Sequence, residues 1–187
     1  AREGGGDFFP LTVDFEEKYY ASGEILGSQF IRREGRPSDE AILNGRIVDR
    51  TIRPLFDQRM RHEVQIVVTM LSIDTAQDPD TLAIIGDSLA LGTSNIPWNG
   101  PVSAVRVKPK EGEPAFDLLA CGKDGLINMI ECEAKELSEE KMHAAFQSAL
   151  PELAAIEEFQ KKIIGEIGKP KLELTIAPVP AELESLF

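Results

Sequence analysis

The segment 28–56, SQFIRREGRPSDEAILNGRIVDRTIRPLF, decides how the rest of this sequence is interpreted. Arginines are concentrated in it and just after it, although the 187-residue chain has a formal net charge of −12: Arg32, Arg33, Arg36, Arg46, Arg50, Arg53, Arg59 and Arg61. The net negative charge argues against a general coat for nucleic acid. It leaves room for a local binding patch, because salt screens charges beyond about 8–10 Å.

The second half of this segment has the pattern of a helix with one apolar and one basic side. Ser38 is suited to be its N-cap, two carboxylates follow in the first turn, and Pro54 ends it. Four charged residues recur at helical spacing: Arg46, Asp49, Arg50 and Arg53. We expect them to form structural ion pairs, with Asp49 as the partner of Arg46 or Arg53. Direct contact of these arginines with a substrate is the alternative.

The residues before this helix, 21–37, form a pattern typical of a long glycine-rich loop. Near its end lie an aromatic ring and three cations: Phe30, Arg32, Arg33 and Arg36. A guanidinium can make paired hydrogen bonds to a phosphate, and an aromatic ring can stack on a base. This combination indicates a contact with single-stranded RNA. A solvated loop with Phe30 packed into the core is the alternative that the residue types leave open.

Strand and helix patterns alternate along the remaining chain. We expect a strand within 7–20, a central strand at 63–74 and a strand at 102–109. Between the last two we expect a buried helix within 77–95, with Asp78 as its cap, Pro79 at the first helical position and a stripe at Leu82, Ile85 and Leu89. A hairpin turning at KDG (123–125) follows, and then a helix from Ser138 that Pro151 kinks or splits. This order predicts an α/β or α+β fold in which helices pack against a mixed sheet.

The hairpin separates the two cysteines. Cys121 is expected opposite a residue near Ile127, and Cys132 opposite one near Phe116. That separation is too large for a disulfide, so we expect two buried, reduced thiols. Three aspartates, Asp74, Asp78 and Asp80, are better explained as caps and turn residues than as metal ligands.

Other recognisable sites are missing from the sequence. It has no glycine-rich phosphate loop, no nucleophile elbow and no zinc-ligand spacing. It also has no apolar run long enough to cross a membrane and no secretion signal, so we expect a cytoplasmic protein. Because the chain begins at Ala1 without a methionine, we also expect it to be a piece of a longer protein.

Several blocks, taken in order, carry a resemblance that covers almost the whole chain. REGRPS (33–38), DRTIRPLF (49–56), IPWNGP (96–101) and MIECEAKELSEEKM (129–142) resemble the first RNase PH-like core domain of the bacterial polynucleotide phosphorylase family. The resemblance implies an RNase PH-like fold, also called ribosomal protein S5 domain 2-like, with a mixed sheet whose N-terminal strands are missing here. It implies a core domain over 1–168 and, over 169–187, a linker towards a helical domain.

The resemblance also implies an activity for the whole protein. Members degrade RNA from its 3′ end with inorganic phosphate, release nucleoside diphosphates, use Mg²⁺, and form homotrimeric rings that bind single-stranded RNA and associate with RNA-degradation complexes. Catalysis is attributed to a second core domain, where the site contains an Asp-x-Lys pattern. Here the matching residues are Asp117, Leu118 and Leu119. We therefore expect no catalytic residue and no Mg²⁺ ligand in this chain.

The family's RNA-gripping pattern, F-F-[RK]-R, falls on residues 30–33, with Ile31 in place of the second aromatic residue. The resemblance therefore implies that Phe30, Arg32, Arg33 and Arg36 guide RNA through the neck of a ring. Two other hypotheses stay open: a stand-alone, inactive RNase PH-like subunit of the exosome type, and an α/β domain whose arginines only form ion pairs. The tail GKPKLELTIAPVP (168–180) favours the longer protein, because it is similar to the start of the family's helical linker.

Overall fold

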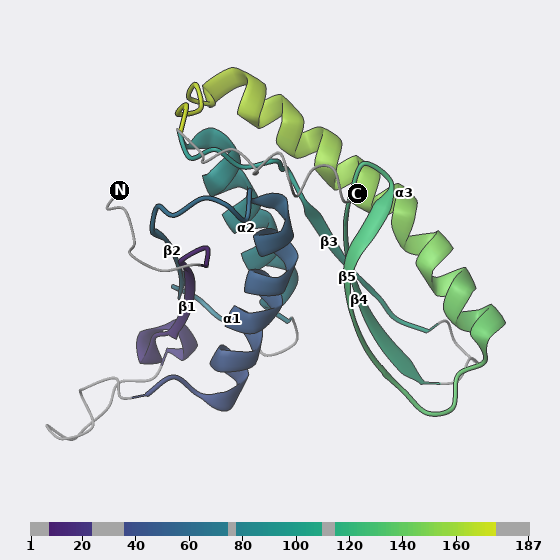
Figure 1. Cartoon of the computed structure of the whole chain (residues 1–187). Coiled ribbons are helices and arrows are strands. Elements are labelled where there is room, and N and C mark those ends of the chain that lie inside the picture. Colours follow the sequence, from purple (N-terminus) through teal and green to yellow (C-terminus); the bar gives the residue numbers. More distant parts are fainter. Residues whose placement is uncertain (1–7, 24–35, 75–77, 110–114, 175–187) are drawn as a thin grey trace, which may run out of the picture.

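The computed structural model describes residues 8–23, 36–74, 78–109 and 115–174 (Figure 1). Its strands are β1 (Leu11–Glu17), β2 (Val64–Met70), β3 (Ser103–Val107), β4 (Phe116–Lys123) and β5 (Leu126–Ala134). Its α-helices are α1 (Asp39–Ile52), α2 (Asp80–Thr93) and α3 (Glu139–Ile167), and two 3₁₀ turns, η1 (Tyr19–Ser22) and η2 (Arg53–Leu55), follow β1 and α1. None of the helices in these ranges is both long enough and apolar enough to span a bilayer.

The elements stack in four layers. In Figure 1, α1 and α2 lie between two sheets, and α3 covers the outer face of the larger sheet. The smaller sheet pairs β1 and β2 in parallel, and the larger one is antiparallel in the order β3-β4-β5. The α/β prediction is confirmed. In the described ranges the strands do not form one mixed sheet. The parallel pair and the antiparallel strands belong to two sheets, which the central helices α1 and α2 separate.

The strand β2 differs from its prediction. The sequence 63–74 is apolar at most positions, which indicated a strand buried on both faces. In the structure Val64 and Ile66 are buried, whereas Val67 on the opposite face is 48% exposed. Within the described residues β2 pairs only with β1, so it is not a central strand there.

Two apolar cores hold the layers together. The larger core lies around the central helices and contains residues such as Phe15, Ile52, Ile84 and Leu119. The smaller one joins the outer face of the larger sheet to α3, with Val105, Ala120, Ala149 and Leu153. Successive residues of β4 therefore serve different cores, since neighbouring side chains of a strand point to opposite faces.

Helix α1 begins where the sequence predicts. The Ser38 hydroxyl accepts a hydrogen bond from the Ala41 amide at 3.0 Å, which confirms the N-cap. Helix α2 begins one residue later than expected, since its N-cap is Pro79 and its first residue is Asp80. Its predicted stripe is also wrong, because Leu82 is 71% exposed and the buried side is formed by Ala83, Ile84, Leu91 and their neighbours.

The β4–β5 hairpin is confirmed, with a different register. Asp124 and Gly125 both have positive φ, as a two-residue turn of this kind requires. With that turn and an irregularity after Cys121, Cys121 pairs with Met129 and Cys132 with Leu118. Both thiols are free. Burial raises the pKa of Cys121 to about 12, whereas Cys132 is exposed, because the second half of the outer strand β5 is not covered.

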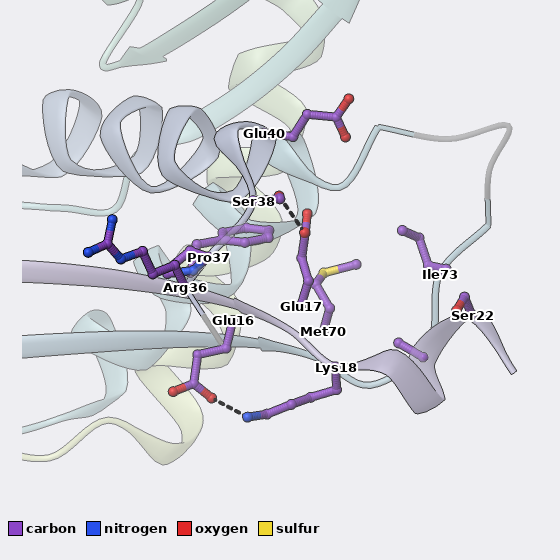
Figure 2. Close-up of a pocket in the computed structure, with 12 residues that line it drawn as sticks. Glu16, Glu17, Lys18, Ser22, Arg36, Pro37, Ser38, Glu40, Met70 and Ile73 are labelled. Atoms are coloured by element: carbon purple, nitrogen blue, oxygen red, sulfur yellow. Dashed lines mark hydrogen bonds and ion pairs between the residues drawn. The ribbon is translucent and has the colours of Figure 1, made fainter. Parts of the chain in front are cut away.

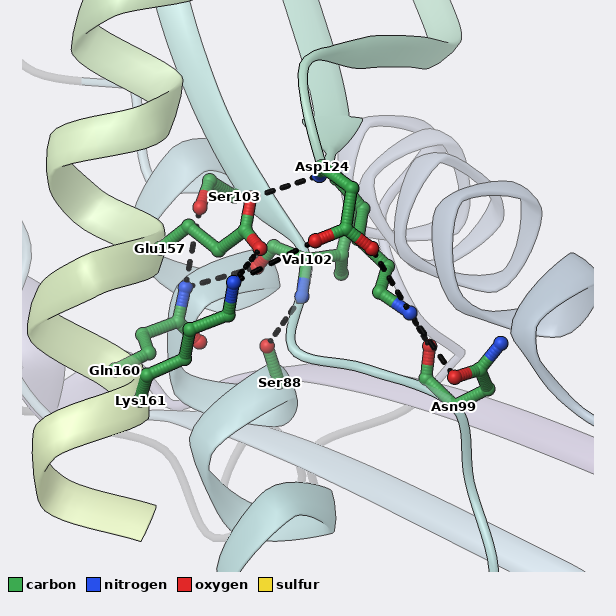
Figure 3. Close-up of polar contacts among 9 residues, drawn as sticks. Ser88, Asn99, Val102, Ser103, Asp124, Glu157, Gln160 and Lys161 are labelled. Carbon is green, nitrogen blue, oxygen red and sulfur yellow. Dashed lines mark hydrogen bonds and ion pairs between the residues drawn. The ribbon is translucent and has the colours of Figure 1, made fainter. Parts of the chain in front are cut away.

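Helix α3 runs through Pro151 without a break over 29 residues, so the expected split is not present. Pro151 lies on the exposed side of the helix, where water can replace the hydrogen bond that proline removes. A polar network holds the second half of α3 in place (Figure 3). Gln160, which is fully buried, donates to the Val102 carbonyl at 2.9 Å, and Glu157 accepts from the Asp124 amide at 2.9 Å.

Asp87 on α2 is a buried carboxyl group that makes stability depend on pH. It is 8% exposed, and its Oδ2 has no hydrogen-bond partner within the described ranges. Desolvation raises the pKa of Asp87 to about 7. Because this value exceeds that of an unfolded chain, about 3.9, folding favours the protonated form, and stability is lost as the pH rises through 7.

We therefore predict that Asp87→Asn removes a pH dependence of folding. From pH 5 to pH 8 the free energy of unfolding of the wild type should fall by about 2–3 kcal/mol more than that of the variant. Urea unfolding followed by the fluorescence of Trp98, the only tryptophan in the sequence, measures this difference. Parallel pH profiles for the two proteins would contradict the prediction.

Candidate nucleic-acid interface

A hollow of about 540 Å³ lies where β1 ends and α1 begins. Figure 2 shows residues from both elements around it, with Met70 and Ile73 from the end of β2 and the segment after it. The hydroxyl of Ser38 donates to the Glu17 carboxylate at 2.6 Å, in addition to capping α1. This hydrogen bond joins the end of β1 to the start of α1, the two elements between which segment 24–35 runs.

The charges around this hollow are mixed. Lys18 pairs with Glu16 at 3.0 Å, which neutralises both side chains locally. Arg36 lines the same hollow, is exposed, and has no ion-pair partner within the described residues. Its guanidinium is therefore available to an anion. Phe30, Arg32 and Arg33 lie outside the described residues.

A second hollow of about 340 Å³ lies beside the first, since both are lined by Phe15 and Pro37. Its walls come from β1 and α1 and include Arg46, Asp49 and Arg53. Arg53 Nε donates to Asp49 at 2.9 Å, and its Nη2 donates to the Leu11 carbonyl at 3.1 Å. Arg53 therefore joins the C-terminal end of α1 to β1 and serves the fold.

Arg46 and Arg50 do not share this role. Asp49 is occupied by Arg53, and neither Arg46 nor Arg50 has an ion-pair partner in the ranges that the structure describes. Both are exposed and lie one helical turn apart on α1. The expected ion pairs are thus present for Asp49 and Arg53 and are not found for Arg46 and Arg50. The physical reason for the missing pairs with Asp49 is that Arg53 already binds both oxygens of this carboxylate.

The arginines after α1 are also engaged. Arg59 binds Asp57 with its Nη2 at 2.7 Å, and its hydrogen bonds lower the pKa of Asp57 to about 2. Arg61 donates to the carbonyls of Gln58 and Met60. Of the described arginines in the cluster, this leaves Arg36, Arg46 and Arg50 as exposed cations. Arg36 precedes the start of α1, and Arg46 and Arg50 lie in its second half.

A cluster of three carboxylates lies elsewhere, around Arg106 on β3. Arg106 Nη1 donates to Asp117 at 2.7 Å, its Nη2 donates to Asp80, and its Nε lies 3.4 Å from Asp78. Leu119, two residues after Asp117, is 1% exposed and belongs to the main core. A guanidinium thus occupies the position between the three carboxylates where a metal ion would have to bind.

These residues do not fit Mg²⁺. No group of three or more His, Cys, Asp or Glu in the described ranges has the arrangement of a metal site. Sequence reasoning missed Arg106 itself, because its partners are 26 and 11 residues away along the chain. The available signal was a lone arginine in an otherwise apolar strand, which must find a counter-charge when it is partly buried.

The layers and the pairing of the strands define an α/β domain of the RNase PH type. The model for domain 1 of the 3′ exoribonuclease family matches residues 1–97, and the chain belongs to this family. Similar curated proteins include one from Thermus thermophilus, 47% identical over 181 residues, which cover 90% of this chain and 25% of that protein. Another, from Pseudothermotoga lettingae, is 42% identical over 195 residues, which cover 98% of this chain and 27% of that protein.

A third relative, from Macrococcus caseolyticus, is 42% identical over 191 residues, which cover 96% of this chain and 27% of its own length. All three are named polyribonucleotide nucleotidyltransferase. The chain therefore spans about a quarter of the length of these relatives.

Proposed function

We propose that this chain is the RNA-guiding part of a polyribonucleotide nucleotidyltransferase, a phosphate-dependent 3′-to-5′ exoribonuclease that releases nucleoside diphosphates. The names of the relatives support the activity of the whole protein. The observation that carries the assignment of this part is the state of its carboxylates. Asp117 is paired with Arg106, and Leu119 is buried where the catalytic pattern has a lysine. Among the described residues, no group at that position is left to bind phosphate or metal.

The exposed arginines support a guiding role. The guanidinium of each of these residues, Arg36, Arg46 and Arg50, can donate two parallel hydrogen bonds to two oxygens of one phosphate. None of them forms an ion pair with a carboxylate in the described ranges, so these arginines could contact RNA without breaking an ion pair. We infer that RNA enters beside segment 24–35, where Phe30, Arg32 and Arg33 add a stacking ring and two cations. Arg46 and Arg50 would continue the path along α1.

The remaining parts of the proposal concern the whole protein. We propose that it assembles as a cytoplasmic homotrimer on single-stranded RNA, within a larger RNA-degradation complex. Mg²⁺ and inorganic phosphate would be bound by residues outside this chain. The length of the relatives favours this proposal over a stand-alone inactive subunit, and the intact mass of the native protein would separate the two.

The test of this function is phosphorolysis of a short single-stranded RNA. We expect the full-length protein to release nucleoside diphosphates only when phosphate and Mg²⁺ are present, and the isolated chain 1–187 to release none. Release by the full-length protein without added phosphate would indicate hydrolysis and contradict the proposed reaction. Release by chain 1–187 would show that a working site lies in this part, and the assignment from Asp117 and Leu119 would be wrong.

A further inference from the structure

The chain does not leave the domain freely after α3. Residues 169–174 turn back onto the C-terminal end of α2, and their backbone is bonded there. The Lys169 amide donates to the Thr93 carbonyl at 3.0 Å, and the Leu172 amide donates to the Asn95 carbonyl at 2.9 Å. Leu174 then packs against the main core. The first six residues of the predicted linker are thus attached to the domain.

Lys171 makes the strongest of these contacts. Its ammonium group donates to three carbonyls, those of Leu91 at 2.7 Å, Gly92 at 3.0 Å and Ser94 at 2.8 Å. The last carbonyls of a helix have no partner within the helix, and the negative end of the helix dipole lies there. A lysine ammonium, with three donors and a positive charge, satisfies both requirements at once.

Each of the last four carbonyls of α2 has a hydrogen-bond donor. The Ala90 carbonyl accepts from the Ser94 amide, the carbonyls of Leu91 and Gly92 accept from Lys171, and that of Thr93 accepts from Lys169. Pro170 lies between the two lysines and has no amide to satisfy. Its fixed φ also reduces the freedom that the segment would lose on binding. Residues 169–174 therefore supply the donors to the Gly92 and Thr93 carbonyls and a second donor to that of Leu91, which also accepts from the Ser94 hydroxyl at 2.9 Å.

We propose that residues 169–174 form an exit clamp that fixes the direction in which the chain leaves this domain, with Lys171 as its anchoring residue. This chain matches about a quarter of the length of its relatives, so about three quarters of each relative lies outside the matched part. A clamped exit would hold the next part of such a protein at a defined orientation to α2. This inference does not depend on the RNA-binding proposal.

Hydrogen exchange in the full-length protein tests the clamp. In Lys171→Met, which keeps the apolar stem and removes the three donors, the amides of Lys169 and Leu172 should exchange at least tenfold faster than in the wild type. The amides in the middle of α2 should be unchanged. Lys171→Arg should restore much of the protection, and Lys162→Met, at an exposed lysine of α3, should have no effect. Unchanged exchange at Lys169 and Leu172, or faster exchange throughout α2 and α3, would overturn the proposal.

The fixed direction is tested separately by small-angle X-ray scattering of the same variants. We expect Lys171→Met to broaden the distribution of interatomic distances of the full-length protein, and Lys171→Arg and Lys162→Met to leave it unchanged. Suppose that hydrogen exchange at Lys169 and Leu172 becomes faster in Lys171→Met while the scattering does not change. Residues 169–174 would then only complete the end of α2. That result would overturn their role in orienting the next segment.

Discussion

Replacing Arg106 with leucine is expected to destabilise the folded domain by about 3–5 kcal/mol at pH 7, the usual cost of removing one partner from a buried ion pair. The critical partner is Asp80, whose side chain is only 2% exposed. Without the guanidinium, its charge would lie buried at the start of α2 with little more than the Thr81 amide, 2.6 Å away, to stabilise it. Urea unfolding at neutral pH measures the loss.

The other two partners of Arg106 should contribute less. Asp117 and Asp78 are 35% and 52% exposed, so water screens them when the guanidinium is gone. The double variant Arg106→Leu/Asp80→Asn should therefore be clearly more stable than Arg106→Leu alone, because it removes the uncompensated charge. Arg46→Leu is the matched control, and it should change the free energy of unfolding by less than about 0.5 kcal/mol. A loss below 1 kcal/mol for Arg106→Leu would contradict the prediction.

This cluster also bears on why the domain would lack chemistry. A lysine at position 119 would point into the main core, because Leu119 packs there with the residues of α1 and α2. The carboxylate of Asp117 would still be held by Arg106. The silent state that we propose thus depends on two features of the fold, and exchanging Leu119 alone would not reverse it.

Local signals in the sequence were sufficient for several elements. Ser38 followed by two carboxylates placed the start of α1, and Asp124-Gly125 placed the hairpin turn, because each acts through hydrogen bonds or dihedral angles of its own neighbours. The stripe of α2 was assigned wrongly for a related reason. That helix is apolar at most positions, so periodicity does not distinguish the side that faces the core from Leu82 on the outside.

The sites depended on contacts between distant segments. Spacing allowed Asp49 to pair with Arg46 or Arg53, and only the position of β1 shows why Arg53 is preferred, since its guanidinium also reaches the Leu11 carbonyl. The same choice leaves Arg46 without a partner in the described ranges. Sequence therefore found the cluster of arginines, whereas the division into structural and exposed members required the fold.

That division leads to the second large effect. The double variant Arg46→Ala/Arg50→Ala is expected to bind single-stranded RNA at least tenfold more weakly at low salt, with an unchanged fold. Each phosphate contact on a single strand contributes about −0.7 to the slope of log affinity against log salt, so losing two contacts should make the slope shallower by about 1.4. Fluorescence anisotropy with a labelled oligonucleotide, on the full-length protein at several salt concentrations, gives both values.

The matched control is Arg59→Ala/Arg61→Ala, which removes the same two charges from the same part of the chain. Arg59 is held by Asp57 and Arg61 by backbone carbonyls, so these guanidiniums are not available to phosphate without breaking local contacts. The control should keep the salt slope of the wild type.

The outcomes of the two double variants separate the possibilities. If both make the salt slope shallower by the same amount, RNA responds to the net charge of the domain, and α1 is not part of the RNA path. If Arg46→Ala/Arg50→Ala keeps the slope while the control loses it, the exposed face of α1 does not contact RNA. A loss confined to Arg46 and Arg50 would place two phosphates one helical turn apart on α1, because only direct contacts can separate variants of equal charge.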